Sequence, residues 1–265
     1  MKTISKFTIG FAGLASILMF TWPLLVRTSD VNEAAVAQSV FIALMPLILL
    51  LVVAEFATGG IGSKQLALLG VLTALNAVVR MLGAGTAGIE TAFFIVIIGA
   101  FVFGGSFGFV LGATSLLVSA LLTGGVGPWL PFQMMAAGLV GLGAGLLKTI
   151  AANFEIGAGQ KRTSRAELTL LSGYAVLASF VYGALMTMWN WPYLAGVGSS
   201  VSYVSGAPLL ENLGRFLNYE IFTGGLLWDC GRAITTSLLI WLTAPALVAS
   251  LRRAATRAGV EKLGA

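Results

Sequence analysis

Residues 91–147 read TAFFIVIIGAFVFGGSFGFVLGATSLLVSALLTGGVGPWLPFQMMAAGLVGLGAGLL, with Glu90 before them, Lys148 after them and no charged residue between. A stretch this apolar cannot be a solvent-exposed loop, and it is too long for a single buried helix. Glycine-rich turns at 103–108 and 123–131 divide it into three parts. Because backbone inside a bilayer must satisfy its own hydrogen bonds, we predict three membrane-spanning helices joined by tight turns.

The composition places the whole chain in a lipid bilayer. Of its 265 residues, 58% are hydrophobic and 9% charged, and the mean hydropathy is +0.96, whereas a typical globular domain has about 25% charged residues. The apolar runs are continuous rather than alternating, which favours helices over a β-barrel. We therefore predict an all-α fold, a polytopic membrane helical bundle with about eight transmembrane helices.

The residue types exclude several functional classes. One cysteine, Cys230, and no histidine exclude a disulfide framework, imidazole metal sites and histidine proton relays. The G-x-x-x-x-G-K-[ST] nucleotide loop is absent, so the chain does not hydrolyse ATP by that route. We expect no enzyme activity, no cofactor and no metal. The net charge of +5 is explained better by membrane topology than by nucleic acid.

Eight apolar segments are predicted to form the helices. They cover about 7–26, 35–57, 65–83, 91–103, 106–123, 130–148, 167–190 and 222–250. We expect 1–60 to form two additional N-terminal transmembrane helices, 61–253 a six-helix core, and 254–265 a basic cytoplasmic tail. The first segment resembles a signal peptide, but no small-x-small cleavage site follows it, so we interpret it as a retained helix.

The distribution of basic residues sets the orientation. With eight passes and the N-terminus in the cytoplasm, eleven Lys and Arg residues fall inside and only Arg27 and Arg215 outside. This asymmetry follows the positive-inside rule and predicts cytoplasmic N- and C-termini in the plasma membrane. The basic loop at 149–166 serves as a topology signal that attracts anionic lipid, or alternatively as a docking surface for a cytoplasmic partner.

Small residues recur at helical spacing on three segments. The rows are Gly104, Gly108 and Gly112; Ala137, Gly141 and Gly145; and Gly70, Ala74 and Ala77. In lipid such faces let two backbones approach closely and gain dispersion contacts. Packing within the chain and docking of another subunit's helix both fit this pattern.

Polar side chains are expensive inside a bilayer, so each one suggests a role. Asp229 and Arg232 are spaced i, i+3, which puts them on one helix face where they pair, as a structural salt bridge or as part of a site. The predicted orientation places most of the intramembrane polarity in the outer half, which favours an outward-facing pocket over a through-channel. The candidate binding residues are Asn76, Arg80, Glu90, Trp129, Gln133, Trp189, Asn190, Asp229 and Arg232.

Two outer connections are candidates for a gate. Pro128 and Pro131 make the turn around Trp129 stiff and non-helical. The long connection at 191–221 is rich in aromatic residues, including Trp191 and Tyr203, and forms either an ordered lid or interfacial anchors for its neighbouring helices.

The segment Gln65–Lys148 resembles the first four helices of S components, the substrate-binding subunits of energy-coupling factor (ECF) transporters. The resemblance rests on residues 65–75 (QLALLGVLTAL), 101–115 (FVFGGSFGFVLGATS) and 127–134 (GPWLPFQM), and it extends over about 65–250. It implies a substrate-binding core that takes up a vitamin or similar micronutrient from outside, and weakly suggests a cobalamin-type compound. It also implies a membrane coupling subunit and two cytoplasmic ATPase subunits as partners.

The resemblance locates the family's site and gate in the loops at 83–90, 123–131 and 191–221 of this chain. The two N-terminal helices depart from the family's six-helix core, and we expect them to be peripheral to ligand binding. The nearest match to the family's small-residue docking motif is Gly70 and Ala74, with Gly141 and Gly145 as further candidates for the partner interface. An autonomous secondary transporter or channel is the alternative, although no inverted repeat is evident.

Overall fold

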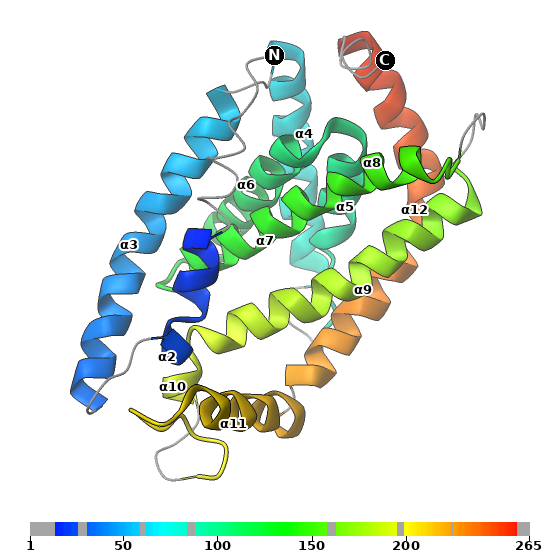
Figure 1. Ribbon diagram of the computed structural model, residues 1–265. Coiled ribbons are helices and arrows are strands. Elements are labelled where there is room, and N and C mark those ends of the chain that lie inside the picture. Colours follow the sequence, from blue (N-terminus) through cyan, green and yellow to red (C-terminus); the bar gives the residue numbers. More distant parts are fainter. Residues whose placement is uncertain are drawn as a thin grey trace.

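The computed structural model of the chain describes residues 14–25, 31–58, 62–83, 88–157, 163–194, 199–223 and 225–258, which form helices and their connections (Figure 1). Residues 14–20 are helical. The helices that follow are α2 (Trp22–Leu25), α3 (Val31–Thr58), α4 (Ser63–Gly83), α5 (Phe93–Phe103), α6 (Gly105–Thr123), α7 (Leu130–Ala144), α8 (Leu146–Asn153), α9 (Arg165–Met188), α10 (Trp191–Leu194), α11 (Leu209–Phe222) and α12 (Gly225–Ala258). The predicted all-α membrane bundle is confirmed. The basic residues Lys2, Lys6, Arg27, Lys161, Arg162 and Lys262 lie outside the described residues.

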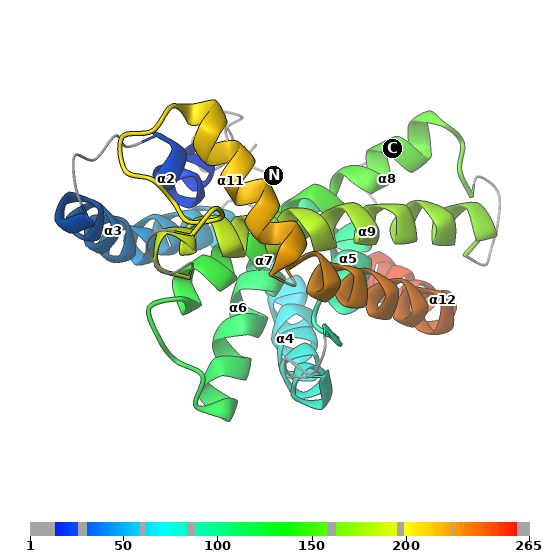
Figure 2. The same cartoon turned by 90° about the horizontal axis from the view of Figure 1, so that it is seen from below.

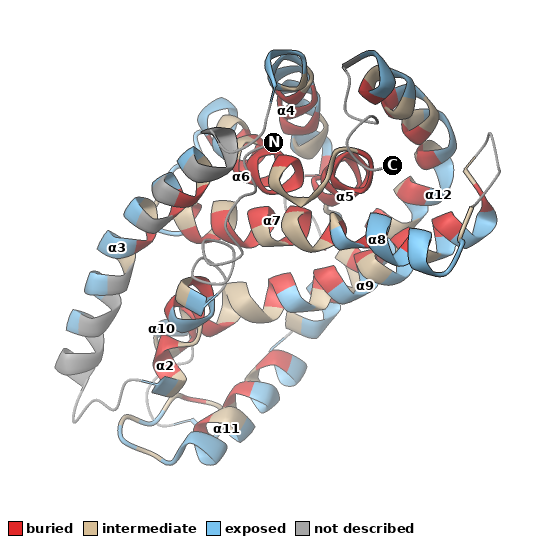
Figure 3. Cartoon of the chain, turned by 45° about the horizontal axis from the view of Figure 1, so that its top comes forward, coloured by how far each residue is buried: buried red, intermediate tan, exposed pale blue. Residues whose placement is uncertain are grey.

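Five stretches are long and apolar enough to cross a membrane. They are α4, α6, residues 130–153 with α7 and α8, α9, and α12 as far as Arg257. α5 has 11 residues and is therefore about 16 Å long, which is short of the ~30 Å hydrocarbon core. All of its residues from Phe93 to Val102 are buried, so α5 is an internal helix covered by α6, α7 and α12 (Figure 3).

Glycine lets α6 and α7 approach closely. A Cβ at Gly141 would overlap the backbone carbonyl of Gly108, and one at Gly112 would overlap that of Ala137. Gly145 meets the backbone of Gly105 in the same way. The small-residue rows of α6 and α7 therefore pack against each other within the chain.

This packing corrects part of the predicted partner interface. Gly141 and Gly145 face α6, so they are not available to another subunit's helix. Gly70 has open space around it and Ala74 is exposed, so these two residues of the α4 row remain uncovered by the described part of the chain, whereas Ala77 is fully buried.

The N-terminal segment packs against the core of the bundle. Phe20 and Trp22 are fully buried. The Trp22 Nε1 donates a hydrogen bond to the Trp189 carbonyl at 2.8 Å, and the Phe20 ring meets the edge of Phe132 at 5.6 Å. At the other end of the chain, α12 continues past residue 253 to Ala258.

The two ends of the bundle differ. α11 lies across one end, where it contacts α2, α9 and α12 (Figures 1 and 2). At the opposite end Ser164 caps α9 through a capping box with Glu167. The buried Glu167 also pairs with Arg252 of α12, whose guanidinium lies over Phe101 of α5. This interaction ties α5, α9 and α12 together at that end.

We predict that Gly141→Ala destabilises the protein, because its new methyl group overlaps the Gly108 backbone. Overpacking of this kind costs about 1–3 kcal/mol. Gly173 on α9 has open space, so Gly173→Ala should be neutral or stabilising. Thermal unfolding of both variants in one detergent measures the difference. Equal unfolding temperatures would show that the α6–α7 contact is looser than described.

Candidate substrate-binding site

Two ion pairs bring together four of the predicted site residues. Arg80 lies in the last turn of α4, and its Nε is 3.7 Å from the carboxylate of Glu90, which precedes α5. The Nη1 of Arg80 donates a hydrogen bond to the Ser119 hydroxyl of α6 at 3.0 Å. Asp229 and Arg232 pair on α12. The predicted i, i+3 pairing is therefore observed. Each arginine has a carboxylate partner, as burial of charge in an apolar bundle requires.

Tyr182 of α9 links the two pairs. Its ring lies 4.9 Å from the Arg232 guanidinium and meets the edge of Phe93 at a centroid distance of 4.8 Å. The charges of Glu90 and Arg80 lie on the same side of the bundle, near enough to affect the Tyr182 phenol. The two pairs and this ring thus form one cluster, named the charged cluster below.

Small residues allow the elements of the charged cluster to meet. A Cβ at Gly183 of α9 would overlap the Asp229 carboxylate. Gly88 has a φ of 77°, in the left-handed region, and lies against the backbone of Trp228 and Gly231. The Arg232 Nη1 donates to the Ser179 carbonyl at 3.1 Å, which fixes α12 against α9.

Several buried polar atoms beside the charged cluster lack a hydrogen-bond partner within the described residues. They include both amide atoms of Asn76 and the Nε of Arg80 on α4, and the Nε of Arg232 and the hydroxyl of Thr236 on α12. Asn76 lies one turn before Arg80, and Thr236 one turn after Arg232. Buried polar atoms in proteins are nearly always paired, so these atoms indicate where a polar ligand would bind.

Glu220 of α11 is a site residue that the sequence analysis missed. It is buried, and neither carboxylate oxygen meets hydrogen-bond geometry within the described residues, although Thr187 lies close enough to interact. Burial raises the pKa of Glu220, and the Arg232 charge opposes that rise. In the sequence, Asn212, Phe216 and Glu220 are spaced four residues apart, which indicates one face of a helix. These three residues form the buried face of α11.

The described residues of the aromatic connection, 191–194 and 199–223, pack against one another. Trp191 is fully buried, donates to the Val201 carbonyl at 3.0 Å, and contacts the rings of Tyr203 and Phe216 at 5.6 and 5.5 Å. The Asn212 side chain accepts a hydrogen bond from the Val204 N–H and donates one to the Val204 carbonyl. α11 is therefore held over the end of the bundle by Trp191 and by residues 199–204.

The remaining predicted site residues form a second group near the start of α7. Trp189 stacks on Phe132 with centroids 4.1 Å apart, and Asn190 is half-buried beside it. Trp129 is 45% exposed, Pro128 is exposed, and Gln133 and Pro131 are half-buried. This group lies on the α6–α7 turn, the start of α7 and the C-terminal end of α9, whereas the charged cluster lies on α4, the loop before α5, the middle of α9 and α12.

The described residues include no group of three or more His, Cys, Asp or Glu side chains able to hold a metal ion. The arrangement instead provides paired charges, unpaired polar atoms and an aromatic ring beneath a capping helix. Such a set fits non-covalent binding of a small polar molecule. The fold and this cluster together define a multi-pass membrane protein with a candidate ligand site inside the bundle.

Comparison with known proteins identifies the family. The sequence profile of the ECF transporter substrate-specific component matches residues 64–258, more than half of the chain. The chain therefore belongs to the family of ECF transporter substrate-specific components. The resemblance to S components predicted from the sequence is confirmed. Comparisons with curated proteins and with solved structures gave no significant match.

We predict that Asp229→Asn destabilises the protein by about 3–5 kcal/mol, because it leaves the Arg232 charge buried without its partner. The double variant Asp229→Asn/Arg232→Gln should recover much of this loss. The control is Glu211→Gln, which breaks the exposed Glu211–Arg215 pair on α11 and should cost less than ~1 kcal/mol. Chemical unfolding of all three measures the coupling. A loss for Asp229→Asn no greater than for the control would contradict the account.

Proposed function

We propose that this protein captures a vitamin or similar micronutrient at the charged cluster and passes it to a separate coupling subunit that works with two ATPases. Membership of the S-component family supports a substrate-specific transport role rather than catalysis. The observation that supports this location is the set of buried polar atoms on Asn76, Arg232 and Thr236 that have no hydrogen-bond partner within the described residues.

The charges of the cluster indicate which chemical groups the ligand would carry. Arg80 with Glu90 and Arg232 with Asp229 are two neutralised pairs, and Glu220 adds a carboxylate outside both pairs. The Arg80–Glu90 contact is the longer one, so Arg80 can exchange Glu90 for an oxygen of the ligand. Arg80 and Asn76 would then bind one polar group of the ligand, and Glu220 a hydrogen-bond donor or cation on another. A cobalamin-type compound is one candidate among micronutrients with groups of both kinds.

The capping segment supports an outward-facing site. In the proposed orientation both termini are cytoplasmic, in the plasma membrane, and α11 faces the outside. Residues 191–222 would then act as the lid, with Trp191 and Tyr203 as its fixed base and Trp129, Pro128 and Pro131 as a second, more exposed rim. Gly70 and Ala74 on the uncovered face of α4 would contact the coupling subunit.

We predict that Arg80→Ala and Asn76→Ala each weaken binding of the copurifying ligand at least about thirtyfold, because truncating a buried polar contact costs about 2 kcal/mol or more. Arg165→Ala, at an exposed position at the start of α9, should not change the affinity. The ligand is identified by mass spectrometry, and its affinity is measured by calorimetry. Normal binding by both site variants would place the pocket elsewhere.

An autonomous secondary transporter or channel would differ from the proposed subunit in its energy source, because it would move its ligand without an ATPase. The proposal expects the chain to copurify with an ATPase and to hold its ligand without ATP. Ligand flux by the chain alone in proteoliposomes would support the alternative.

We predict that single cysteines label from opposite sides of the membrane in a Cys230→Ser background. Leu210 and Asn153 are exposed at the α11 end and the opposite end. Leu210→Cys should react with an impermeant maleimide in intact cells, and Asn153→Cys only after permeabilisation. The reverse pattern would show that the charged cluster opens to the cytoplasm.

A further inference from the structure

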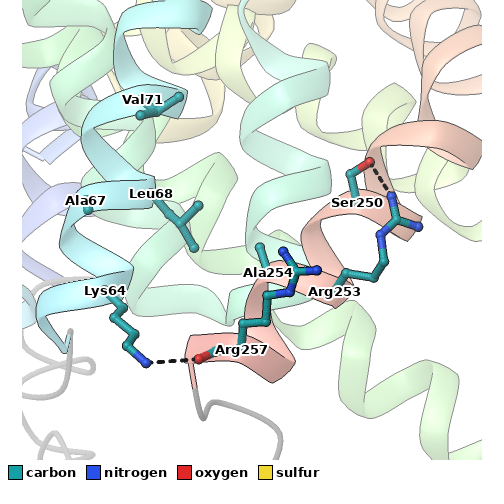
Figure 4. Close-up of a pocket in the computed structure, with 8 residues that line it drawn as sticks. All are labelled: Lys64, Ala67, Leu68, Val71, Ser250, Arg253, Ala254 and Arg257. Carbon is teal, nitrogen blue, oxygen red and sulfur yellow. Dashed lines mark hydrogen bonds between the residues drawn. The ribbon is translucent and has the colours of Figure 1, made fainter.

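A groove separates the first turns of α4 from the last turns of α12 (Figure 4). Its volume is about 620 Å³, and Leu68, Val71 and Ala254 contribute apolar walls. Lys64 and Arg257 meet at one end of it, and Arg253 lies one turn before Arg257 on α12 and points toward Ser250. The groove lies at the end of the bundle away from α11, so it is distinct from the charged cluster.

The basic end of the groove has no acidic residue in its lining. The Lys64 Nζ donates to the Arg257 carbonyl at 3.2 Å and so spans the groove, and Arg253 donates to the Ser250 hydroxyl at 3.1 Å. None of the salt bridges between described residues involves these three cations. Their charges are therefore not compensated within the described part of the chain, and they attract an anion.

The rest of the groove is apolar and opens along a membrane-spanning helix. Val71 is 66% exposed, and Leu75 and Val78 continue the exposed apolar surface along α4. Hydrocarbon chains of the bilayer would cover such a surface. The cations and the apolar walls of the groove match the charged headgroup and the acyl chains of an anionic phospholipid, respectively. Gly70 points about 100° around α4 from Val71, but Ala74 lies on the same side of α4 as Ala67, which lines the groove, so the groove borders the small-residue face.

We propose that this groove binds one anionic phospholipid, with its phosphate at Lys64, Arg253 and Arg257 and an acyl chain along Leu68 and Val71. The occupant is a lipid rather than a soluble phosphate, because the apolar walls would otherwise face the anion or water. An acidic protein segment would satisfy the cations but would not require the apolar continuation along α4.

Native mass spectrometry of the full chain in detergent tests the proposal. The probes are phosphatidylglycerol and phosphatidylcholine with the same acyl chains at equal concentration. We expect the wild type to retain phosphatidylglycerol preferentially. Arg253→Gln/Arg257→Gln should reduce this preference at least about fivefold, since each basic residue near an anionic lipid contributes about that factor. Lys148→Gln/Arg165→Gln removes two charges from exposed positions outside the groove and should leave the preference intact.

A second pair of measurements tests the apolar half. Val71→Glu should weaken retention of phosphatidylglycerol, and excess inorganic phosphate should not displace the lipid. If the Arg253→Gln/Arg257→Gln variant does not fold, Lys64→Gln takes its place as the charge variant. Equal losses in the two charge doubles, displacement by phosphate, or unchanged lipid retention in Val71→Glu would each overturn the proposal. The proposal would also be overturned if the groove bound a protein and the loss of that contact left the preference for phosphatidylglycerol unchanged.

Discussion

The structure depends on the pairing of the two arginines that lie within the apolar bundle, Arg80 and Arg232. Arg80 and Arg232 come from the two helices α4 and α12, and each is matched with a carboxylate nearby. An unpaired charge at either place would cost several kcal/mol. Pairing fixes where the loop before α5 can lie and how α12 faces α9, because Glu90 and Ser179 supply the partners. The charged cluster is thus a constraint on the fold as well as the candidate site.

Close backbone packing supplies the rigid support for this cluster. α6 and α7 meet through Gly108 and Gly141, and the short helix α5 is enclosed by its neighbours. Lipid gives no hydrophobic driving force between helices, so dispersion contacts and hydrogen bonds must hold the bundle together. At the far end, the Glu167–Arg252 pair ties α9 to α12. The site end is completed by α11, an amphipathic helix that contributes the buried Glu220.

The sequence predicted the long apolar helices and the Asp229–Arg232 pair because both follow from short-range patterns, but it gave α11 as part of a connection. It left Gly141 open between internal and partner contacts, since a small-residue face has the same spacing in either case. The placement of Trp22 against Trp189 joins residues 167 positions apart, which no local pattern specifies. Tyr182 and Glu220 were missed because an aromatic in a membrane helix and an acid on an amphipathic helix are common without any site. Only their tertiary neighbours distinguish them.

The most direct measurement of the central claim is a cryo-electron microscopy map of the chain in nanodiscs with its copurified ligand. The account predicts ligand density beneath α11, in contact with Arg80 and Asn76 of α4 and Arg232 of α12. Density for the ligand outside this cluster, with the Arg80–Glu90 and Asp229–Arg232 pairs undisturbed, would show that the buried charges are structural only and would contradict the account.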